Sequence, residues 1–260
     1  MDIRGRKILL TGASGGLGEA IAVDLAGRGA QLVVTARRVE QLERLQERTG
    51  AEVIVADLTD RGDLDRVVEA ARGVDVLIAN AGTGNDTPIA EMTTDDVDRS
   101  IDVNLRAPVL MATAFVNERV ARRLPGQVVF IGSLSGLAPT PDTRMYNATK
   151  FGLRGFALSL REDLLGTGVG VSIVEPGFIR DAGMFAASGT QLPPGVRTKA
   201  PADVAEGVAR AIAEDRAEVF VAPVELRLAA TFATVAPALS SRVQQRLGTR
   251  EIKATGRASG

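Results

Sequence analysis

The stretch Thr11-Gly12-Ala13-Ser14-Gly15-Gly16-Leu17-Gly18 joins a short apolar run, residues 7–11, to a segment of helical periodicity. Glycines let a backbone turn tightly and approach a ligand closely, and the first amides of a helix bind anions. A glycine-rich turn between a strand and a helix is therefore typical of a pyrophosphate site. The spacing here is Gly-x-x-x-Gly-x-Gly, not Gly-x-Gly-x-x-Gly, so the turn alone is equally compatible with a plain strand-to-helix connection.

Working outward from this turn, short runs rich in Val, Ile and Leu alternate with longer helical segments along the chain. This alternation predicts an α/β fold, a doubly wound seven-stranded parallel sheet (Rossmann fold) with helices on both faces. The chain has 260 residues, and we expect a single domain over residues 1–247 with a flexible tail at 248–260. The expected strands are residues 7–11, 31–36, 52–56, 74–79, 127–132, 169–174 and 218–221.

Two helices are indicated by apolar stripes. Leu17, Ile21 and Leu25 recur every four residues and are followed by glycines, as at a helix end. A second stripe contains Val97, Ile101 and Leu105, and the pattern Thr93-x-x-Asp96 before it predicts a capped helix start.

The composition excludes several kinds of chemistry. The chain has no Cys and no His, so we expect no disulfide, no metal site of Cys/His type and no Ser-His-Asp triad. Acid–base chemistry must then use Asp, Glu, Lys or Tyr. The formal net charge is −1, which gives no reason to expect nucleic-acid binding. With no signal-peptide pattern and no apolar run of spanning length, the expected location is cytoplasmic.

Tyr146 and Lys150 form the most specific pair in the sequence. The chain has one Tyr and four Lys, and a spacing of four residues places both side chains on one face of a helix. A free Tyr has a pKa of about 10. A neighbouring ammonium favours phenolate and so acts to lower the Tyr146 pKa. The alternative is a surface Tyr–Lys contact without chemistry.

Several residues lie at or just past the ends of different expected strands. Carboxyl ends of parallel strands share one edge, and open α/β sheets bind ligands there. Turn preference alone explains Gly, Asn, Asp and Pro at such positions, but it does not explain an Arg or a Ser. The residues in question are Gly12, Arg37, Asp57, Asn80, Ser133 and Pro176.

Together these motifs resemble the short-chain dehydrogenase/reductase family. The resemblance rests on the glycine turn, Asn80-Ala81-Gly82, Ser133, the Tyr146/Lys150 pair and Pro176-Gly177, and it covers about residues 5–225. It implies an NAD(P)-dependent oxidoreductase that reduces a ketone or oxidises a secondary alcohol on a moderately apolar substrate. It also implies a homodimer or homotetramer.

The resemblance implies roles for individual residues. Ser133 would bond the substrate oxygen, and Tyr146 would act as general acid/base. Lys150 and an oxidised nicotinamide both favour phenolate and would together lower the Tyr146 pKa toward neutrality. Lys150 would also hold the nicotinamide ribose. Asn104 would support a water-mediated proton relay, and it falls on the second apolar stripe, although a buried Asn is more often a structural hydrogen-bonder. The implied cofactor-binding residues are Gly12, Ser14, Gly16, Leu17, Gly18, Arg37, Arg38, Asp57, Leu58, Asn80, Ala81, Gly82, Tyr146, Lys150, Pro176, Gly177 and Ile179.

Cofactor preference is indicated by Arg37 and Arg38 after the second strand. A carboxylate there would bond the ribose 2′-hydroxyl of NAD, whereas Arg accommodates the 2′-phosphate of NADP. NADP(H) is therefore expected to be preferred, with NAD(H) as the alternative. Asn80 would also stabilise the central strand. Arg180 and Asp181 stand where the family often has Thr or Ser near the carboxamide, and these two side chains could simply pair.

The sequence identifies the residues that would contact the substrate less specifically than those that would bind the cofactor. Residues 188–201 are expected to form a substrate loop, and residues 224–247 a C-terminal helical extension that serves as a dimer or lid helix. An interfacial membrane contact of this extension is the alternative. The apolar side chains that line a pocket under the loop, or pack in the core, are Leu134, Leu137, Met184, Phe185 and Leu192. Those that recur along the extension are Leu226, Leu228, Phe232, Val235 and Leu239.

Two other functions remain open. Arg119, Arg122 and Arg123 form a basic helix end that could face a carrier protein, which would suit a 3-oxoacyl-thioester reductase of fatty-acid or polyketide type. The same residues also suit an ordinary helix C-terminus. A non-catalytic dinucleotide-binding regulator on the same fold is the second alternative. A sensor needs no proton donor, so the presence of Tyr146 argues against it.

Overall fold

The computed structural model describes residues 1–84, 87–140, 142–187, 192 and 196–246. Half of the expected substrate loop 188–201 and all of the expected tail lie outside the described residues. The described chain forms a seven-stranded sheet in the order β3-β2-β1-β4-β5-β6-β7. All six strand pairs are parallel, which confirms the predicted doubly wound sheet.

The strands follow the apolar runs of the sequence to within a residue or two. Every residue of the central strands β4 and β5 is buried, as expected where helices cover both faces of a sheet. The strands are β1 (Lys7–Thr11), β2 (Gln31–Ala36), β3 (Glu52–Val55), β4 (Val76–Ala79), β5 (Gly126–Ile131), β6 (Val169–Pro176) and β7 (Glu218–Val221).

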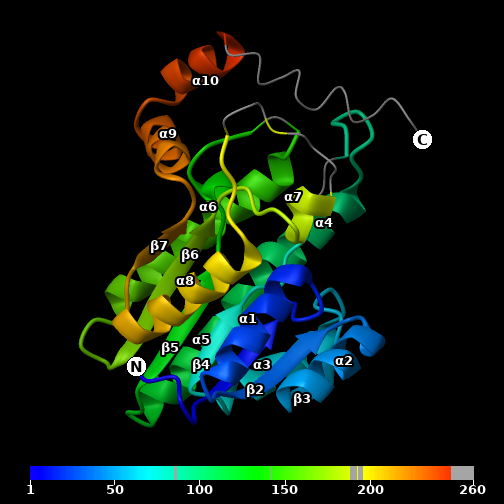
Figure 1. The fold of residues 1–260 in the computed structure, drawn as a ribbon, viewed down its shortest axis with the longest axis vertical. Helices are drawn as coiled ribbons and strands as arrows, with labels where there is room; N and C mark the ends of the chain where they lie inside the picture. The colour runs from blue at the N-terminus through cyan, green and yellow to red at the C-terminus, as the bar shows by residue number, and fades with distance from the viewer. Residues whose placement is uncertain (85–86, 141, 188–191, 193–195, 247–260) are drawn as a thin grey trace.

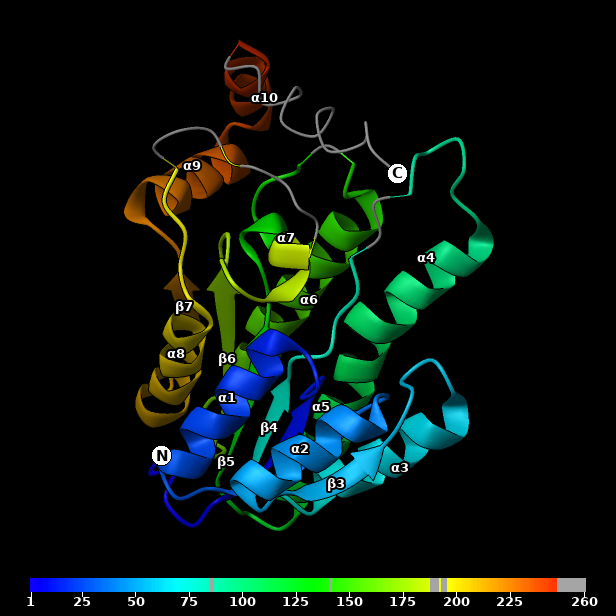
Figure 2. The same cartoon turned by 45° about the vertical axis from the view of Figure 1, so that its right-hand side comes forward.

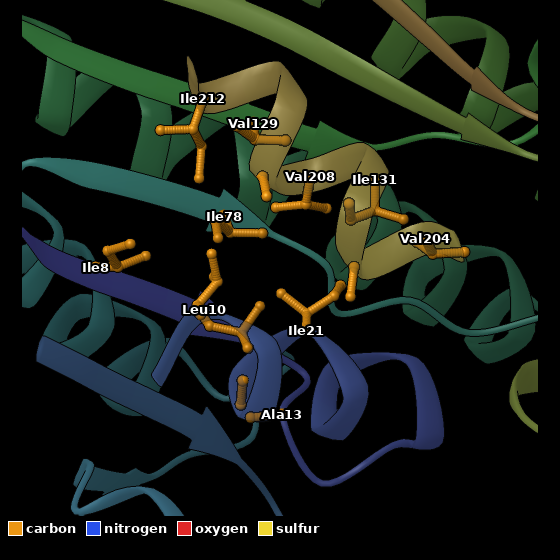
Figure 3. Close-up of a cluster of buried hydrophobic side chains, with 14 of the residues drawn as sticks. Ile8, Leu10, Ala13, Ile21, Ile78, Val129, Ile131, Val204, Val208 and Ile212 are labelled. Atoms are coloured by element: carbon orange, nitrogen blue, oxygen red, sulfur yellow. The ribbon is translucent and has the colours of Figure 1, made fainter. Parts of the chain in front are cut away.

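Helices cover both faces of the sheet (Figures 1 and 2). On one face lie α1 (Gly16–Gly27), α2 (Val39–Thr49) and α8 (Pro201–Glu214), and on the other lie α3 (Arg61–Arg72), α5 (Ala107–Ala121) and α6 (Arg144–Asp163). Figure 3 shows the first layer, where Leu10 and Ile78 of the sheet meet Ile21 of α1 and Val208 of α8. These fully buried side chains fix the strands whose ends carry the candidate site.

Helix α4 (Thr94–Ile101) begins at the predicted cap. The Asp96 carboxylate accepts the Thr93 N–H at 3.0 Å, and the Thr93 hydroxyl oxygen accepts the Asp96 N–H at 3.2 Å. This reciprocal pair satisfies two amide donors that a helix start leaves unpaired.

The second predicted apolar stripe is only partly buried: Leu105 packs partly against the core, but Ile101 is exposed. Ile101 is 37% exposed, whereas Ser100 and Asn104 are 1% exposed. The physical reason is a π-helical turn at Asp102–Arg106, which joins α4 to α5. Such a turn has more residues than an α-helical one and changes which side chains face inward. Asn104, within this turn, is buried against Thr149 of α6.

Arg119, predicted as part of an exposed basic helix end, is buried instead. Its Nη2 donates to the Asp75 carboxylate at 3.0 Å and to the Val74 carbonyl, and its guanidinium lies 5.6 Å from the centroid of the Phe115 ring. The last turn of α5 thus packs against the residues that lead into β4. Only Arg122 and Arg123 of the predicted trio remain on the surface.

The C-terminal extension is helical, as predicted, and consists of two helices, α9 (Val224–Val235) and α10 (Pro237–Arg246) (Figure 1). Proline lacks an N–H and restricts the residue before it, and Ala236 is accordingly non-helical, with φ −133°. Apolar side chains on α9 are exposed, including Leu228 and Phe232. None of the helices in the described part of the chain combines the length and apolarity needed to cross a membrane.

Candidate active site

The glycine turn is packed tightly against the chain that leaves β4. Gly12 has φ +68°, and a Cβ there would lie 2.7 Å from the Cα of Ala81. A Cβ on Gly18 would overlap the carbonyl oxygen of Gly12 and lie 2.9 Å from the Asn80 Nδ2. Glycine at both positions therefore lets the start of α1 approach the end of β4, as the sequence predicted for a tight turn.

Asn80 and Thr11 lock this arrangement in place. The Asn80 Nδ2 donates to the carbonyl oxygens of Thr11 at 2.9 Å and Gly12 at 3.2 Å. The Thr11 hydroxyl oxygen accepts the N–H groups of Asn80 and Ala81 at 3.1 and 3.0 Å. Asn80 thus stabilises the junction of β1 and β4. Thr11 was not predicted as a site residue, although its place directly before the glycine turn is a usable signal.

Two arginines lie at the end of β2, beside the turn. Arg38 donates to the Ser14 carbonyl at 2.5 Å, and Arg37 lies 3.5 Å from the Asp57 carboxylate with 65% of its side chain exposed. Burial disfavours the charged form of Asp57, but hydrogen bonds from Thr59 and the charge of Arg37 together hold its pKa below the usual value. Leu58 belongs to the buried core. The predicted cofactor residues on β1, β2 and β3 therefore gather at one edge.

Ser133, Tyr146 and Lys150 come together at the end of β5. Ser133 leaves the strand and opens the short 3₁₀ turn η2 (Leu134–Gly136), while α6 carries Tyr146 and Lys150 one turn apart. The Ser133 and Tyr146 hydroxyls are hydrogen-bonded. The Lys150 Nζ lies 5.7 Å from the centroid of the Tyr146 ring and donates to the Ile131 carbonyl at 2.7 Å.

The Tyr146 pKa is raised to about 12, so Lys150 alone does not produce the predicted lowering. Burial is the main cause and outweighs the hydrogen bond with Ser133, and the carboxylate of Glu175 raises the pKa further. Lys150 does not reverse this effect because its Nζ is turned to the Ile131 carbonyl, and burial lowers its own pKa to about 8. Tyr146 is therefore a protonated phenol at neutral pH, the form that can donate a proton.

Asn104 has a structural role in this site. Its Oδ1 accepts the Thr83 N–H at 2.7 Å, and its Nδ2 donates to the Thr83 carbonyl at 2.8 Å and to the Thr149 hydroxyl at 3.2 Å. The side-chain amide thus ties the segment after β4 to α6 beside Lys150. The proton relay implied by the resemblance stays a prediction.

The segment after β6 crosses the start of α1 (Figure 2). Pro176 is the last residue of β6, and Ile179 is buried. The Gly177 N–H donates a hydrogen bond to the Val221 carbonyl at 3.0 Å. Arg180 and Asp181 form an ion pair at 3.3 Å, as their sequence suggested.

A close approach at Gly16 fixes where this segment passes. A Cβ on Gly16 would lie 2.5 Å from the Cβ of Ala182, so the chain before the short helix α7 (Gly183–Ala187) lies directly over the glycine turn. Leu17 packs partly against the core and lies beside Gly183.

The predicted apolar pocket is only partly described. Leu137 is buried in the core, Leu134 and Leu192 are half-buried, and Met184 is 43% exposed beside Gly84. The side chain of Phe185 lies outside what the structure describes. Substrate contacts on this side therefore stay predictions.

Two residues that the sequence prediction missed also belong to this cluster. Asn147, next to Tyr146, donates to the carbonyl oxygens of Ser135 and Ala138 at 2.8 and 3.1 Å and so holds the chain that follows η2. Glu175 is fully buried, and its Oε2 accepts the Ser133 N–H at 2.5 Å. An acidic residue within a mostly apolar strand was the signal for Glu175.

Comparisons with known proteins agree with this geometry. The profile described as short chain dehydrogenase matches residues 6–192. A 3-oxoacyl-[acyl-carrier-protein] reductase of Rickettsia conorii is 32% identical over 182 residues, which are 69% of this chain and 75% of the relative.

Solved structures extend the likeness over nearly the whole chain. A short-chain dehydrogenase from Sphingobium yanoikuyae in complex with NADPH has a TM-score of 0.76 and 27% identity, covering 94% of this chain and 95% of its own. A bulky-bulky ketone specific alcohol dehydrogenase from Comamonas testosteroni has a TM-score of 0.73 and 26% identity, covering 95% and 94%. With the profile matched across most of the sequence and the sheet in the same arrangement, the chain belongs to the short-chain dehydrogenase/reductase family.

Proposed function

We propose that the protein is an NADP(H)-dependent oxidoreductase that reduces a ketone, or oxidises the corresponding secondary alcohol, on a moderately apolar substrate. The observation that carries this proposal is the grouping of Ser133, Tyr146 and Lys150 beside the glycine turn. The Sphingobium relative was solved with NADPH, and the Comamonas relative is specific for bulky ketones, which supports both parts of the proposal.

The residues around the glycine turn fit NADP(H). Gly16 and Gly18 leave the start of α1 without side chains, so the helix N-terminus can approach a pyrophosphate. Arg37 is 65% exposed, which leaves its guanidinium accessible to a 2′-phosphate. Arg38 donates hydrogen bonds to the hydroxyl and carbonyl oxygens of Ser14, within the glycine turn. NAD(H) lacks the phosphate and is the alternative cofactor.

The side chains of this chain would handle the proton and the substrate oxygen. When bound, the nicotinamide supplies or accepts the hydride. Tyr146 would donate its phenol proton to the carbonyl oxygen during reduction and recover it during oxidation. Ser133 would hold that oxygen next to the Tyr146 hydroxyl. The Lys150 ammonium, 5.7 Å from the ring centroid, would favour the phenolate that remains after transfer.

The function is tested by following NADPH oxidation with the full-length protein across bulky and small ketones, steroid-like ketones and 3-oxoacyl thioesters. We expect turnover with at least one apolar ketone. Absence of turnover with every class, together with intact NADPH binding, would instead favour the non-catalytic regulator.

A second candidate function is 3-oxoacyl-thioester reduction, and the Rickettsia relative is the observation that favours it. The buried Arg119 weakens the case for a basic carrier-protein surface on this helix, where only Arg122 and Arg123 are exposed. The same set of substrates tests this function. If kcat/KM for a 3-oxoacyl thioester is well above that for every simple ketone, the protein is a 3-oxoacyl-thioester reductase.

Arg37→Asp is expected to shift cofactor preference toward NADH. The new carboxylate repels the 2′-phosphate of NADPH and can accept a hydrogen bond from the 2′-hydroxyl of NADH. We expect kcat/KM for NADPH to fall by about tenfold or more, since one lost charge-assisted interaction of roughly 1.5–3 kcal/mol has that size. Steady-state kinetics with both cofactors measure the ratio.

Arg72→Asp is the matched control for this charge change. Arg72 is the last residue of α3, at the opposite edge of the sheet, where it pairs with Glu69 on the surface. Its replacement is expected to leave the NADPH/NADH ratio unchanged. If Arg37→Asp behaves like this control, the 2′-phosphate is bound elsewhere.

A further inference from the structure

Glu175 is a fully buried carboxylate beside the candidate catalytic residues. It is the penultimate residue of β6, next to β5 in the sheet, and its exposed fraction is 0%. Its Oε1 is buried without a hydrogen-bond partner. Burying a carboxylate in this way is costly. A buried titratable group with one unsatisfied oxygen at such a point indicates a role beyond packing.

The position of Glu175 is set by two neighbours on the chain that leaves β5. Its Oε2 accepts the Ser133 N–H at 2.5 Å. Gly132 provides the space, because a Cβ there would collide with the same carboxylate oxygen and lie 2.8 Å from the Glu175 Cδ. Since β5 ends at Ile131, the carboxylate supplies the acceptor that the amide of Ser133 needs beyond the strand.

The charged groups that face Glu175 come from α6 and β7. On α6, Lys150 attracts the carboxylate, and the Arg154 Nε lies 3.9 Å from its Oε1. On β7, the Glu218 carboxylate accepts from the Arg154 Nε at 2.8 Å and repels Glu175. Tyr146 is also on α6, and the negative charge of Glu175 raises its pKa because it disfavours phenolate.

Resting on the proposed function, we propose that Glu175 is a positioning residue: it anchors the Ser133 backbone so that the Ser133 and Tyr146 hydroxyls face one substrate oxygen, and, when ionised, its carboxylate opposes formation of phenolate at Tyr146. Ser133 adopts an extended backbone here, with φ −172° and ψ 153°, and its Oγ also accepts the Ser135 N–H at 3.1 Å. The hydrogen bond from the Ser133 N–H to Glu175 therefore holds the Ser133 backbone, while the hydrogen bond from Ser135 holds its side chain.

Glu175→Gln tests the charge directly. The amide keeps the size and an oxygen that can accept from Ser133, but it carries no charge. Because the chain has one Tyr and no Trp, ultraviolet absorbance of phenolate reports Tyr146 alone. The Glu175 pKa, raised by burial to about 8, lies below the Tyr146 pKa of about 12, so Glu175 is ionised when Tyr146 titrates. We expect the Tyr146 pKa to fall by about one unit in this variant.

Glu175→Leu tests the anchor. Leucine fills a similar volume but leaves the Ser133 N–H without its acceptor. We expect kcat to fall by about 10²-fold, as for a misplaced catalytic group, with the KM for NADPH unchanged within about threefold. Glu175→Gln should retain kcat within about fivefold of the wild type, because its oxygen still accepts from Ser133.

Glu218→Gln is the matched control, since it removes a carboxylate from the same cluster without touching Ser133. It should leave kcat unchanged and shift the Tyr146 titration less than Glu175→Gln does. An unmoved titration in Glu175→Gln overturns the proposal, whether or not the leucine variant folds. Wild-type kcat in a folded leucine variant overturns the anchor. The titration needs no substrate, so failure of the wild type to reduce any ketone would be a separate result.

Discussion

Tyr146→Phe is expected to lower kcat for ketone reduction by about 10²- to 10⁴-fold, the range contributed by a positioned general acid. Phenylalanine keeps the ring beside Lys150 and removes only the hydroxyl. The chain has no His or Cys to substitute for it. The Lys150 Nζ is bonded to the Ile131 carbonyl, and Ser133 is too weak an acid to replace a phenol.

NADPH affinity should change by no more than a few fold in this variant, because the ring and its packing remain. Steady-state NADPH oxidation gives kcat, and a fluorescence titration with NADPH gives Kd. Phe151→Leu changes a ring on the same helix that is 40% exposed, and it should leave both constants unchanged within about twofold. If Tyr146→Phe retains kcat within tenfold of the wild type, another group donates the proton.

The features that the sequence predicted correctly depend on short-range patterns. The runs that became β4 and β5 are buried throughout, and apart from Gln127 each contains only apolar residues or glycine. The Thr93 and Asp96 cap acts across three residues and needs no tertiary information. The gathering of Gly12, Asn80 and Ser133 follows from one topological rule, that parallel strands end at a common edge.

The features that were missed depend on partners far along the chain. Arg119 is buried by Asp75, 44 residues away, and Glu175 meets Ser133 across 42 residues. The π-helical turn at Asp102–Arg106 follows an exposed Ile101, and no apolar period predicts such a turn.

The direction of the Tyr146 pKa was likewise set in three dimensions. It follows from burial and from the orientation of Lys150 toward Ile131, and a spacing of four residues specifies neither of them. The sequence therefore identified the candidate pair, while the protonation state of Tyr146 depends on the packing around it.

Gly18→Ala is expected to damage both the cofactor site and the fold. The added Cβ would overlap the Gly12 carbonyl oxygen and lie 2.8 Å from the Ala13 Cα, which is well inside ordinary carbon contact of about 3.5–4 Å. All the nearest atoms but one are backbone, so the turn itself must move, and the Asn80 hydrogen bonds to Thr11 and Gly12 move with it. We expect the free energy of unfolding to fall by about 1–3 kcal/mol and NADPH affinity to fall at least about tenfold.

Gly27→Ala separates this packing effect from the general effect of replacing a helical glycine. Gly27 ends the same helix, and a Cβ there meets nothing within 4 Å. Alanine at this position should leave NADPH affinity unchanged and raise the free energy of unfolding by up to about 0.5–1 kcal/mol, because it restricts the unfolded chain. Chemical denaturation and NADPH titration of both variants make the comparison. If the two variants have the same NADPH affinity and the same free energy of unfolding, α1 does not need the close approach at Gly18. The glycine turn would then not be the pyrophosphate site.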